Sequence, residues 1–341
     1  MNNKLLTRDQ FRDLVFERDG NRCVVCHGAG DAAHHIMERR LFDDGGYYLD
    51  NGATLCADCH YLAETTQFHT DYIRHCAGIE KVVLPPYLYD DCIYDKWGNI
   101  ILGNRRIKGP LFHEESVQKV LEHVLHLFSN YVKYPRTYHL PWSPGFTKDD
   151  RILNNVDHFL NRPIVITEKM DGENTTMYRD YMHARSIDSE HHASQSWARN
   201  LHSRISSSIP FGWRICGENL YAKHSIQYNN LESYFLVFSI WDDKNNCLSW
   251  NDTLDWCSLL DLAHVPVRYT SSFLNSSTMQ SICKQLQNDS LSEGYVIRVV
   301  DEFHYSAFRH NIAKYVRDGH VSTTHHWKRS NIIKNSLGEN R

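Results

Sequence analysis

The stretch Thr167-Glu168-Lys169-Met170-Asp171-Gly172-Glu173-Asn174 is the part of the chain around which the rest is organised. An apolar run from Pro163 to Thr167 comes directly before Lys169, so this lysine stands at the end of a predicted strand and is followed by a polar turn. An ammonium that loses its solvation has a lowered pKa and can act as a nucleophile. The octet alone also fits a surface lysine before a β-turn, because Asp-Gly is a common turn dipeptide.

The composition sets wide limits on what the chain can be. Its 341 residues suggest two domains, and 41% apolar residues suffice for a core in each. The formal net charge is -4, so a nucleic-acid surface has to come from local clusters of Lys and Arg. The first ten residues lack an apolar signal core, and no apolar run reaches the roughly 18 residues that span a membrane. We therefore expect a cytoplasmic protein without a membrane partner. The sequence does not indicate an oligomeric state.

Four of the ten cysteines form two CxxC pairs: Cys23, Cys26, Cys56 and Cys59. In a reducing compartment cysteines are free thiols or metal ligands, and two CxxC pairs can close a tetrahedral cage around zinc. The spacing predicts a structural zinc site, and chance pairing of unrelated cysteines is the alternative. A helix over residues 7–20 is expected before the first pair, with Thr7 as its N-cap and Gly20 at its end.

The segment between the two pairs contains His34 and His35, and Asn51 and His60 flank the second pair. Over about residues 8–65 this pattern resembles the HNH (ββα-metal) endonucleases, in the group whose finger is held by two CxxC pairs. The resemblance implies that His34 and His60 hold a divalent cation, that His35 is the general base that deprotonates water, and that Asn51 fixes the loop holding His35. Imidazole titrates near neutrality and can take such a proton. The alternative is a zinc module that only binds nucleic acid, since a further metal ligand at the helix end is not evident.

The middle of the chain is expected to connect two domains. Residues 82–88 and 100–102 are predicted strands joined by a tight turn, and residues 114–131 have the apolar spacing of a helix that packs on a core. These segments form an expected connector over residues 79–130. A loop rich in proline and aromatic residues, 133–145, leads into the second domain.

Five further short patterns follow the octet, each on or beside a predicted strand. They are His183-Ala-Arg185-Ser186, Gly217-Glu218-Asn219, Tyr234 to Asp242 with Phe238 inside it, Ser292-Glu293-Gly294, and Ala313-Lys314-Tyr315-Val316-Arg317. Taken singly, Phe238 fits a core aromatic, and Glu218 and Glu293 fit exposed carboxylates at strand ends. The order of the whole set favours one shared site.

In this order the patterns resemble the covalent nucleotidyltransferases, specifically the ATP-dependent RNA ligases, over about residues 131–328. In that family the lysine of KxDG attacks the α-phosphorus of ATP, forms lysyl-AMP with loss of pyrophosphate, and passes AMP to a 5′-phosphate, after which a 3′-hydroxyl displaces AMP. The resemblance implies these roles: Lys169 as nucleophile, Glu168 and Asn174 as nucleotide ligands, Arg185 at the phosphate and the RNA end, Glu218 on the ribose, Phe238 on adenine, Glu293 at the catalytic metal or its waters, and Lys314 at the α-phosphate.

The last pattern departs from the family. Many members have Lys-x-Lys there, whereas this chain has Val316 in place of the second lysine and Arg317 after it. The sequence therefore leaves the identity of the second cation open. Expulsion of pyrophosphate requires cations at the phosphorus, and Lys314, Arg317 and Mg²⁺ could supply them. The same positive neighbours are expected to keep Lys169 neutral.

Together the resemblances imply an α+β chain. A small ββα-metal HNH-like zinc module, residues 1–78, and the connector, residues 79–130, precede an antiparallel-sheet nucleotidyltransferase domain, similar to the ATP-grasp-like adenylylation domain of ligases, over residues 131–341. The implied cofactors are ATP, Mg²⁺ (or Mn²⁺), structural Zn²⁺ and a divalent cation at the HNH site. The implied partner is RNA with nicked or broken strands, with RNA–DNA hybrid or DNA left open.

HNH cleavage generally leaves the 3′-hydroxyl and 5′-phosphate ends that a ligase joins. We therefore expect an RNA ligase coupled to a nuclease or nucleic-acid-binding module in nucleic-acid repair. A DNA ligase or an RNA-capping guanylyltransferase is the more distant alternative.

Overall fold

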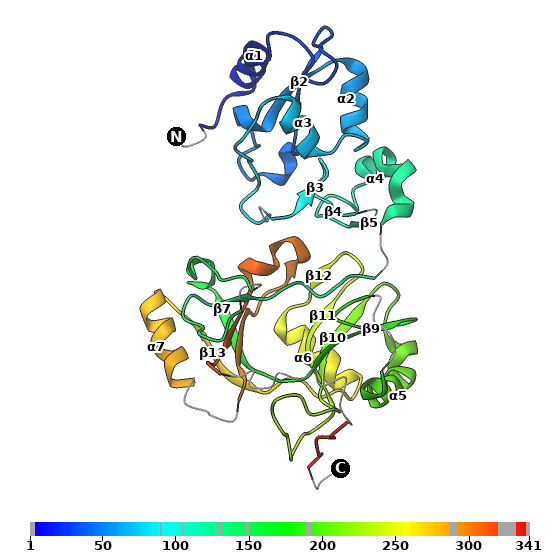
Figure 1. Cartoon of the computed structure of the whole chain (residues 1–341), viewed down its shortest axis with the longest axis vertical. Helices are drawn as coiled ribbons and strands as arrows, with labels where there is room; N and C mark the ends of the chain where they lie inside the picture. Colours follow the sequence, from blue (N-terminus) through cyan, green and yellow to red (C-terminus); the bar gives the residue numbers. More distant parts are fainter. Residues whose placement is uncertain are drawn as a thin grey trace. The chain divides into compact units, whose positions relative to one another are not determined.

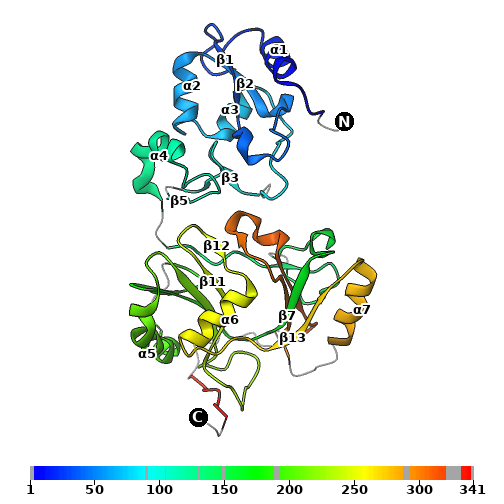
Figure 2. The same ribbon diagram turned by 180° about the vertical axis from the view of Figure 1, so that it is seen from behind.

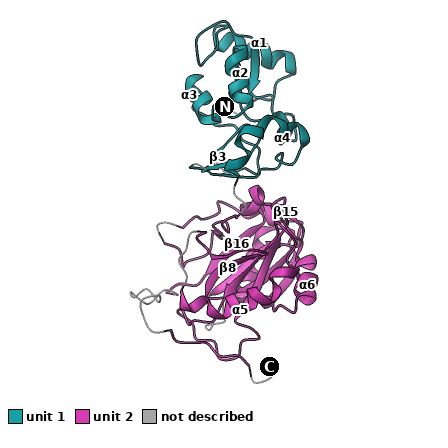
Figure 3. Ribbon diagram, turned by 90° about the vertical axis from the view of Figure 1, so that its right-hand side faces the viewer, with its two compact units in different colours: residues 1–130 teal, residues 131–341 magenta. Residues whose placement is uncertain are grey.

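The computed structural model describes residues 4–88, 91–103, 105–128, 131–147, 150–187, 192–286, 292–319 and 332–338. The chain divides into two compact units, residues 1–130 and 131–341, which Figure 3 shows in different colours. Among the described residues, no helix combines the length and the apolar character that a membrane crossing requires.

The first unit combines short helices with a two-stranded and a three-stranded antiparallel sheet (Figure 1). Its elements are α1 (Arg8–Arg18), β1 (Ala32–His35), β2 (Gly52–Leu55), α2 (Ala57–Glu64), α3 (Thr70–Cys76), β3 (Ile93–Tyr94), β4 (Ile100–Leu102), β5 (Arg105–Ile107) and α4 (Glu115–Leu121). The predicted helix over residues 7–20 is confirmed as α1 with Thr7 as its N-cap, but it ends at Arg18, before Gly20. The Thr7 hydroxyl accepts from the Gln10 N–H, and the Gln10 side chain accepts from the Thr7 N–H, as in a capping box.

Two expectations about the connector are wrong in detail. Residues 82–88 form no strand, because Pro85 and Pro86 have no N–H to give to a ladder. The helix expected over residues 114–131 is α-helical only as α4 and continues as a 3₁₀-helix to Leu127, a tightening that is frequent at helix ends. Residues 129 and 130 lie outside the described part of the chain.

The β3–β4 turn packs tightly on the rest of the first unit. The buried Asp95 carboxylate accepts from the Trp97 and Asn99 N–H groups, and the Arg106 guanidinium lies 3.0 Å from it. The Trp97 indole N–H donates to the carbonyl of Glu64, the last residue of α2. A division of this unit at residue 78 therefore stays a prediction.

The second unit contains two larger sheets with helices beside them. Its elements are β6 (Tyr138–His139), β7 (Pro163–Lys169), β8 (Glu173–Tyr178), β9 (Met182–Ala184), α5 (Ser196–Ile205), β10 (Arg214–Asn219), β11 (Phe235–Trp241), β12 (Asn246–Cys247), α6 (Trp250–Leu259), β13 (Val267–Ser272), α7 (Ser276–Leu286), β14 (Gly294–Val299), β15 (Phe303–His304) and β16 (Ile312–Val316). The strand orders are β15-β12-β11-β10-β8-β9 and β13-β7-β14-β16-β6, antiparallel throughout except for β16 and β6. The predicted α+β class with antiparallel sheets is confirmed.

Two apolar clusters hold the second unit together. In the first, α5 and α6 pack beside the six-stranded sheet, where Leu201 and Cys257 meet Ile215 and Val237 (Figure 2). In the second, Val165 of the five-stranded sheet meets Leu236 of the six-stranded sheet. The two sheets therefore share a core, and β7 reaches its end between them.

Candidate functional site

Lys169 is the last residue of strand β7, whose apolar residues are buried between two neighbouring strands. The run from Ile164 to Thr167 is buried between β13 and β14. The next two residues, Glu168 and Lys169, are half-buried. The turn after it requires glycine, since a Cβ on Gly172 would lie 2.6 Å from the Asn219 carbonyl oxygen. The sequence thus places the lysine at a strand end where two backbones meet closely.

Carboxylates, and not cations, dominate the surroundings of Lys169. Its Nζ donates to the Glu293 Oε2 at 2.6 Å. Burial lowers the pKa of Lys169, but the charges of Glu293 and Glu218 outweigh it and hold that pKa above its ordinary value. The expectation that positive neighbours keep Lys169 neutral is therefore wrong, because Glu293, from the loop before β14, forms an ion pair with the ammonium.

A second carboxylate, Glu218, lies on the neighbouring sheet and binds the turn itself. Its Oε1 accepts from the Gly172 N–H at 3.1 Å. Burial, only partly offset by Lys169, raises the pKa of Glu218 to about 8. Asp171 fixes the other side of the turn, because its Oδ2 accepts from the N–H groups of Ser225 and Ile226. Three carboxyl groups, those of Asp171, Glu218 and Glu293, therefore gather around one ammonium.

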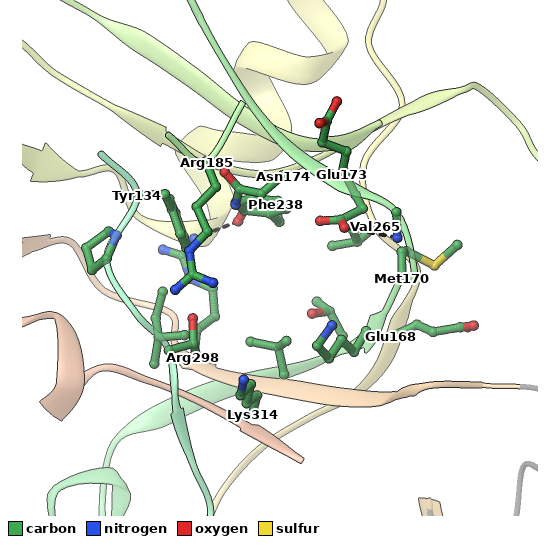
Figure 4. Close-up of a pocket in the computed structure, with 18 of the residues that line it drawn as sticks. Tyr134, Glu168, Met170, Glu173, Asn174, Arg185, Phe238, Val265, Arg298 and Lys314 are labelled. Carbon is green, nitrogen blue, oxygen red and sulfur yellow. Dashed lines mark hydrogen bonds between the residues drawn. The ribbon is translucent and has the colours of Figure 1, made fainter. Parts of the chain in front are cut away.

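Lys169, Gly172 and Glu218 border a cavity of about 580 Å³ between the two sheets (Figure 4). The predicted residues that line it are Glu168, Lys169, Asn174, Arg185, Glu218, Phe238 and Lys314. Glu293 joins the site through its bond to Lys169. Arg317 is not among the lining residues, and its backbone N–H donates to the Glu293 carbonyl oxygen at 3.1 Å. The carboxylate of Glu168 pairs with Arg268 at 3.3 Å, so this residue borders the cavity without offering a free carboxylate.

Sequence patterns missed several lining residues, of which Arg298 and Tyr134 stand next to Phe238. Arg298 is 2% exposed, and its guanidinium donates to the carbonyl oxygens of Phe238 and Leu248. The Tyr134 ring meets the Phe238 ring edge-on, with centroids 5.0 Å apart. The period-2 alternation of β14, from Val296 to Arg298, was the one available indication that Arg298 faces the cavity.

Lys314 is held by a carboxylate from the loop before β7. Its Nζ lies 3.4 Å from Asp150 Oδ1, and the same oxygen is 3.5 Å from His139 Nε2. Burial lowers the pKa of Lys314, although Asp150 opposes this. Figure 4 shows the Lys314 side chain pointing toward the cavity. Asp150 and His139 form a support for Lys314 that the sequence patterns did not reveal.

His139 predicts a pH dependence of stability. Burial, reinforced by Lys314, lowers its pKa from 6.5 to about 4. The folded chain therefore binds fewer protons here than the unfolded chain, and stability that is complete above pH 6.5 is lost as the pH falls toward 4, by about 3 kcal/mol for a residue this buried. We expect His139→Gln to reduce the difference in urea-unfolding free energy between pH 7 and pH 4.5. An unchanged difference would remove His139 from the account of acid sensitivity.

Comparison with known proteins gives one match to a family. Residues 162–316 match the RNA ligase family. This RNA ligase-like segment begins one residue before β7 and ends with β16, so it contains Lys169, Glu218, Glu293 and Lys314 and excludes the first unit. No curated protein sequence matches the chain.

Solved structures give weaker likenesses. An RNA ligase of Naegleria gruberi, with PPi, is 17% identical, and the match covers 62% of this chain and 69% of that chain with a TM-score of 0.39. A putative ATP-dependent DNA ligase from Aquifex aeolicus is 16% identical over 67% of this chain and 54% of that chain, with a TM-score of 0.37. An archaeal ATP-dependent RNA ligase is 16% identical over 51% and 48%, with a TM-score of 0.36. At these scores the likenesses support no conclusion about this chain.

The first unit holds two clusters of potential metal ligands outside the RNA ligase-like segment. One contains the four cysteines of the CxxC pairs, whose Sγ atoms all lie within 4.8 Å of one another. Cys23 and Cys59 are buried, and the Sγ atoms of Cys26 and Cys56 are 3.6 Å apart. Four convergent sulfurs fit the tetrahedral coordination of zinc.

The second cluster consists of His34, His60 and Glu64, whose ligand atoms also lie within 4.8 Å of one another. His34 comes from β1, and the other two come from one face of α2. Glu64 Oε1 is 3.2 Å from His60 Nε2 and 3.5 Å from His34 Nδ1. Glu64 is a potential ligand that the sequence interpretation did not find, although its i+4 spacing from His60 on a helix indicated it.

His35 does not join this cluster. Its ring stacks on Phe11 at a centroid distance of 4.4 Å and meets Tyr47 edge-on. Burial and the charge of Lys96 lower the pKa of His35 to about 4. Asn51 lies where it can fix the loop after His35, because its side-chain amide accepts from the Met37 N–H and donates to the carbonyl oxygens of Met37 and Gly46.

Proposed function

We propose that the second unit is an ATP-dependent RNA ligase that joins 3′-hydroxyl and 5′-phosphate ends. The observation that carries the proposal is the meeting of Lys169, Glu218, Phe238 and Lys314 at one cavity, inside the segment that matches the RNA ligase family. A cavity of about 580 Å³ has the size of a nucleotide-scale ligand site.

In the first step Lys169 Nζ attacks the α-phosphorus of ATP. A nitrogen–phosphorus bond forms, the bond to pyrophosphate breaks, and the ammonium proton has to leave Nζ. Glu293 Oε2, 2.6 Å away, is placed to accept it. Lys314 faces the cavity and can neutralise charge on the α-phosphate, with Arg317 as the candidate second cation.

The carboxylates around Lys169 fit a divalent cation. Asp171 and Glu293 carry two negative charges beside one ammonium, Glu218 adds a further oxygen donor, and oxygen ligands are those that Mg²⁺ and Mn²⁺ take. Such a cation would stabilise charge at the phosphorus and draw the carboxylates away from Lys169. The raised pKa of the metal-free lysine is consistent with a nucleophile that is inactive until ATP and metal arrive.

The remaining groups suit the nucleotide and the RNA end. Phe238 offers a ring for stacking on adenine, and Glu218 offers a carboxylate for the ribose hydroxyls. Asn174 Oδ1 is buried and has no hydrogen-bond partner among the described residues, so it is an available acceptor. Arg185 is exposed at the cavity and is placed to contact the phosphate of an RNA end.

Incubation with ATP or GTP labelled at the α-phosphate, followed by nicked RNA, RNA–DNA hybrid or nicked DNA, tests this function. We expect covalent labelling by ATP and transfer of the label to RNA. Labelling by GTP alone would indicate a capping guanylyltransferase, and sealing of DNA alone would indicate a DNA ligase. Absence of any covalent label would contradict the proposal.

For the first unit we propose an HNH-like zinc module, with Zn²⁺ held by the four cysteines and a second divalent cation held by His34, His60 and Glu64. Two imidazoles and a carboxylate are a suitable donor set for such a cation. The module would cut a nucleic acid and leave ends that the ligase joins, with His35 as the proton acceptor. The packing of His35 against Phe11, away from the cluster, favours the second candidate, a module that only binds nucleic acid.

Replacement of His35 by alanine separates these two functions. A nuclease is expected to nick RNA or DNA in the presence of Mg²⁺ or Mn²⁺ and to lose at least a hundredfold in rate in the variant, because general-base catalysis contributes about that much or more. Gel assays on both nucleic acids, with His75→Ala on the exposed face of α3 as a control, measure this. If the wild-type protein cuts neither substrate and only binds them, the nuclease half of the proposal fails.

A further inference from the structure

A buried lysine from the β3–β4 turn touches the His34, His60 and Glu64 cluster. The side chain of Lys96 is 7% exposed, and its Nζ donates to Glu64 Oε1 at 2.6 Å and to the His35 carbonyl oxygen at 3.3 Å. A second carboxylate oxygen, from Glu38, lies 3.8 Å from the same Nζ. A lysine with this little exposure is uncommon unless it is paired.

The turn that carries Lys96 is rigidly built. The carboxylate of Asp95, which is fully buried, binds two backbone N–H groups of the turn and Arg106. On the other side, the Trp97 ring centroid lies 5.5 Å from the Lys96 ammonium, and the indole N–H holds the Glu64 carbonyl oxygen. Lys96 and Glu64 are thus fixed relative to each other from both sides of the contact.

The ammonium competes for the atom that a metal would need. Glu64 Oε1 is the oxygen nearest to His60 Nε2 and His34 Nδ1, and the same oxygen accepts from Lys96. Of the three cluster members Glu64 alone supplies negative charge. A divalent cation bound by both histidines and Glu64 would meet the charge of Lys96 at the shared carboxylate, and like charges at this separation repel strongly in a poorly solvated site.

We propose that Lys96 is the internal counter-ion of this site: it neutralises Glu64 in the metal-free protein, and a divalent cation has to displace it. Lys96 then sets the metal affinity of the cluster, and the turn between β3 and β4 belongs to the site instead of being a linker. This inference rests on the metal site proposed above for the first unit.

Titration of the zinc-loaded full-length chain with Co²⁺ tests the counter-ion. Zinc occupies the cysteine cluster in this sample, and any exchange of Co²⁺ into it would be seen as thiolate charge-transfer bands, which Co²⁺ bound by nitrogen and oxygen lacks. The part of the Co²⁺ absorption that is lost in His34→Ala comes from this cluster. Co²⁺ bound by the carboxylates of the second unit would still absorb in that variant. We expect Lys96→Met to bind Co²⁺ at least tenfold more tightly than the wild-type chain, and Lys96→Arg to stay close to it.

Lys119→Met is the matched control. This substitution removes one positive charge from an exposed residue of α4 that pairs with Glu115. We expect the Lys119→Met variant to bind Co²⁺ with the affinity of the wild type. Circular dichroism monitors folding, and Lys96→Gln replaces the methionine variant if that variant does not fold. Equal affinities of the wild type and the Lys96 variants, with a signal that depends on His34, would overturn the counter-ion role and leave the metal site standing. No His34-dependent signal in any variant would overturn both.

Discussion

Lys169→Ala is expected to abolish the transfer of AMP from ATP to the protein, with a loss of at least a thousandfold in covalent labelling. The expectation follows from position: Lys169 Nζ is at the end of a buried strand, borders the cavity and is bonded to Glu293 at 2.6 Å. Removal of a nucleophile leaves no atom for the phosphorus to join, so binding of ATP cannot compensate for it. The measurement is the radioactivity retained on denatured protein after incubation with α-labelled ATP.

Two further variants make this result specific. Lys284→Ala changes an exposed lysine of α7 and is expected to label as the wild type does. Lys169→Arg keeps the charge next to Glu293 but lacks an amine that can be deprotonated, so it is expected to fold and not to label. Equal labelling of Lys169→Ala and the wild type would show that the covalent bond forms elsewhere and would remove the central claim for the second unit.

The patterns around the cavity could be predicted because each one lies on a strand or directly beside one. β7, β10 and β16 place Lys169, Glu218 and Lys314 at the cavity, and Glu293 directly precedes β14. The order of these patterns along the chain already favoured one site. The antiparallel sheets were expected from the resemblance to the nucleotidyltransferases. A local sequence pattern can predict a strand and the polar residues on it or next to it.

The electrostatic balance of the site could not be predicted in this way. Whether Lys169 meets a cation or a carboxylate depends on the register between β7 and β14, which brings Gly294 opposite Lys169 and Glu293 beside it across more than 100 residues. Asp150 reaches Lys314 from a loop with no pattern of its own. Such long-range pairs are properties of the folded chain and leave no local periodicity.

The same distinction separates the two clusters of the first unit. The cysteine cluster was visible as two CxxC pairs, because zinc ligands come in short spacings from tight turns. Glu64 was missed although it is four residues after His60, since a glutamate on a short helix is most often a solvated residue. Lys96 was invisible as a partner, because only the packing of the β3–β4 turn on α2 brings it to Glu64.

Replacement of Cys59 by serine is expected to unfold the first unit while the second unit keeps its fold. Cys59 is 7% exposed and packs in the apolar cluster with Val24, Ile36 and Leu55, so the sulfur cage and the core of the unit are one structure. Structural zinc contributes roughly 10 kcal/mol or more to folding, which exceeds the stability that a small core supplies alone. Loss of one ligand removes a large part of that contribution.

Zinc content and hydrogen exchange measure the effect of Cys59→Ser together. The wild-type chain is expected to carry one zinc per chain and to protect the amides of β1 and β2, and the variant is expected to lose both. Cys76→Ser, which changes a half-buried cysteine beside the same core but outside the cage, is expected to keep zinc and protection. Covalent labelling by ATP should persist in both variants, because Lys169 and its cavity belong to a unit with its own core. Retention of zinc and of β1–β2 protection by Cys59→Ser would show that the four cysteines do not hold the metal that stabilises this unit.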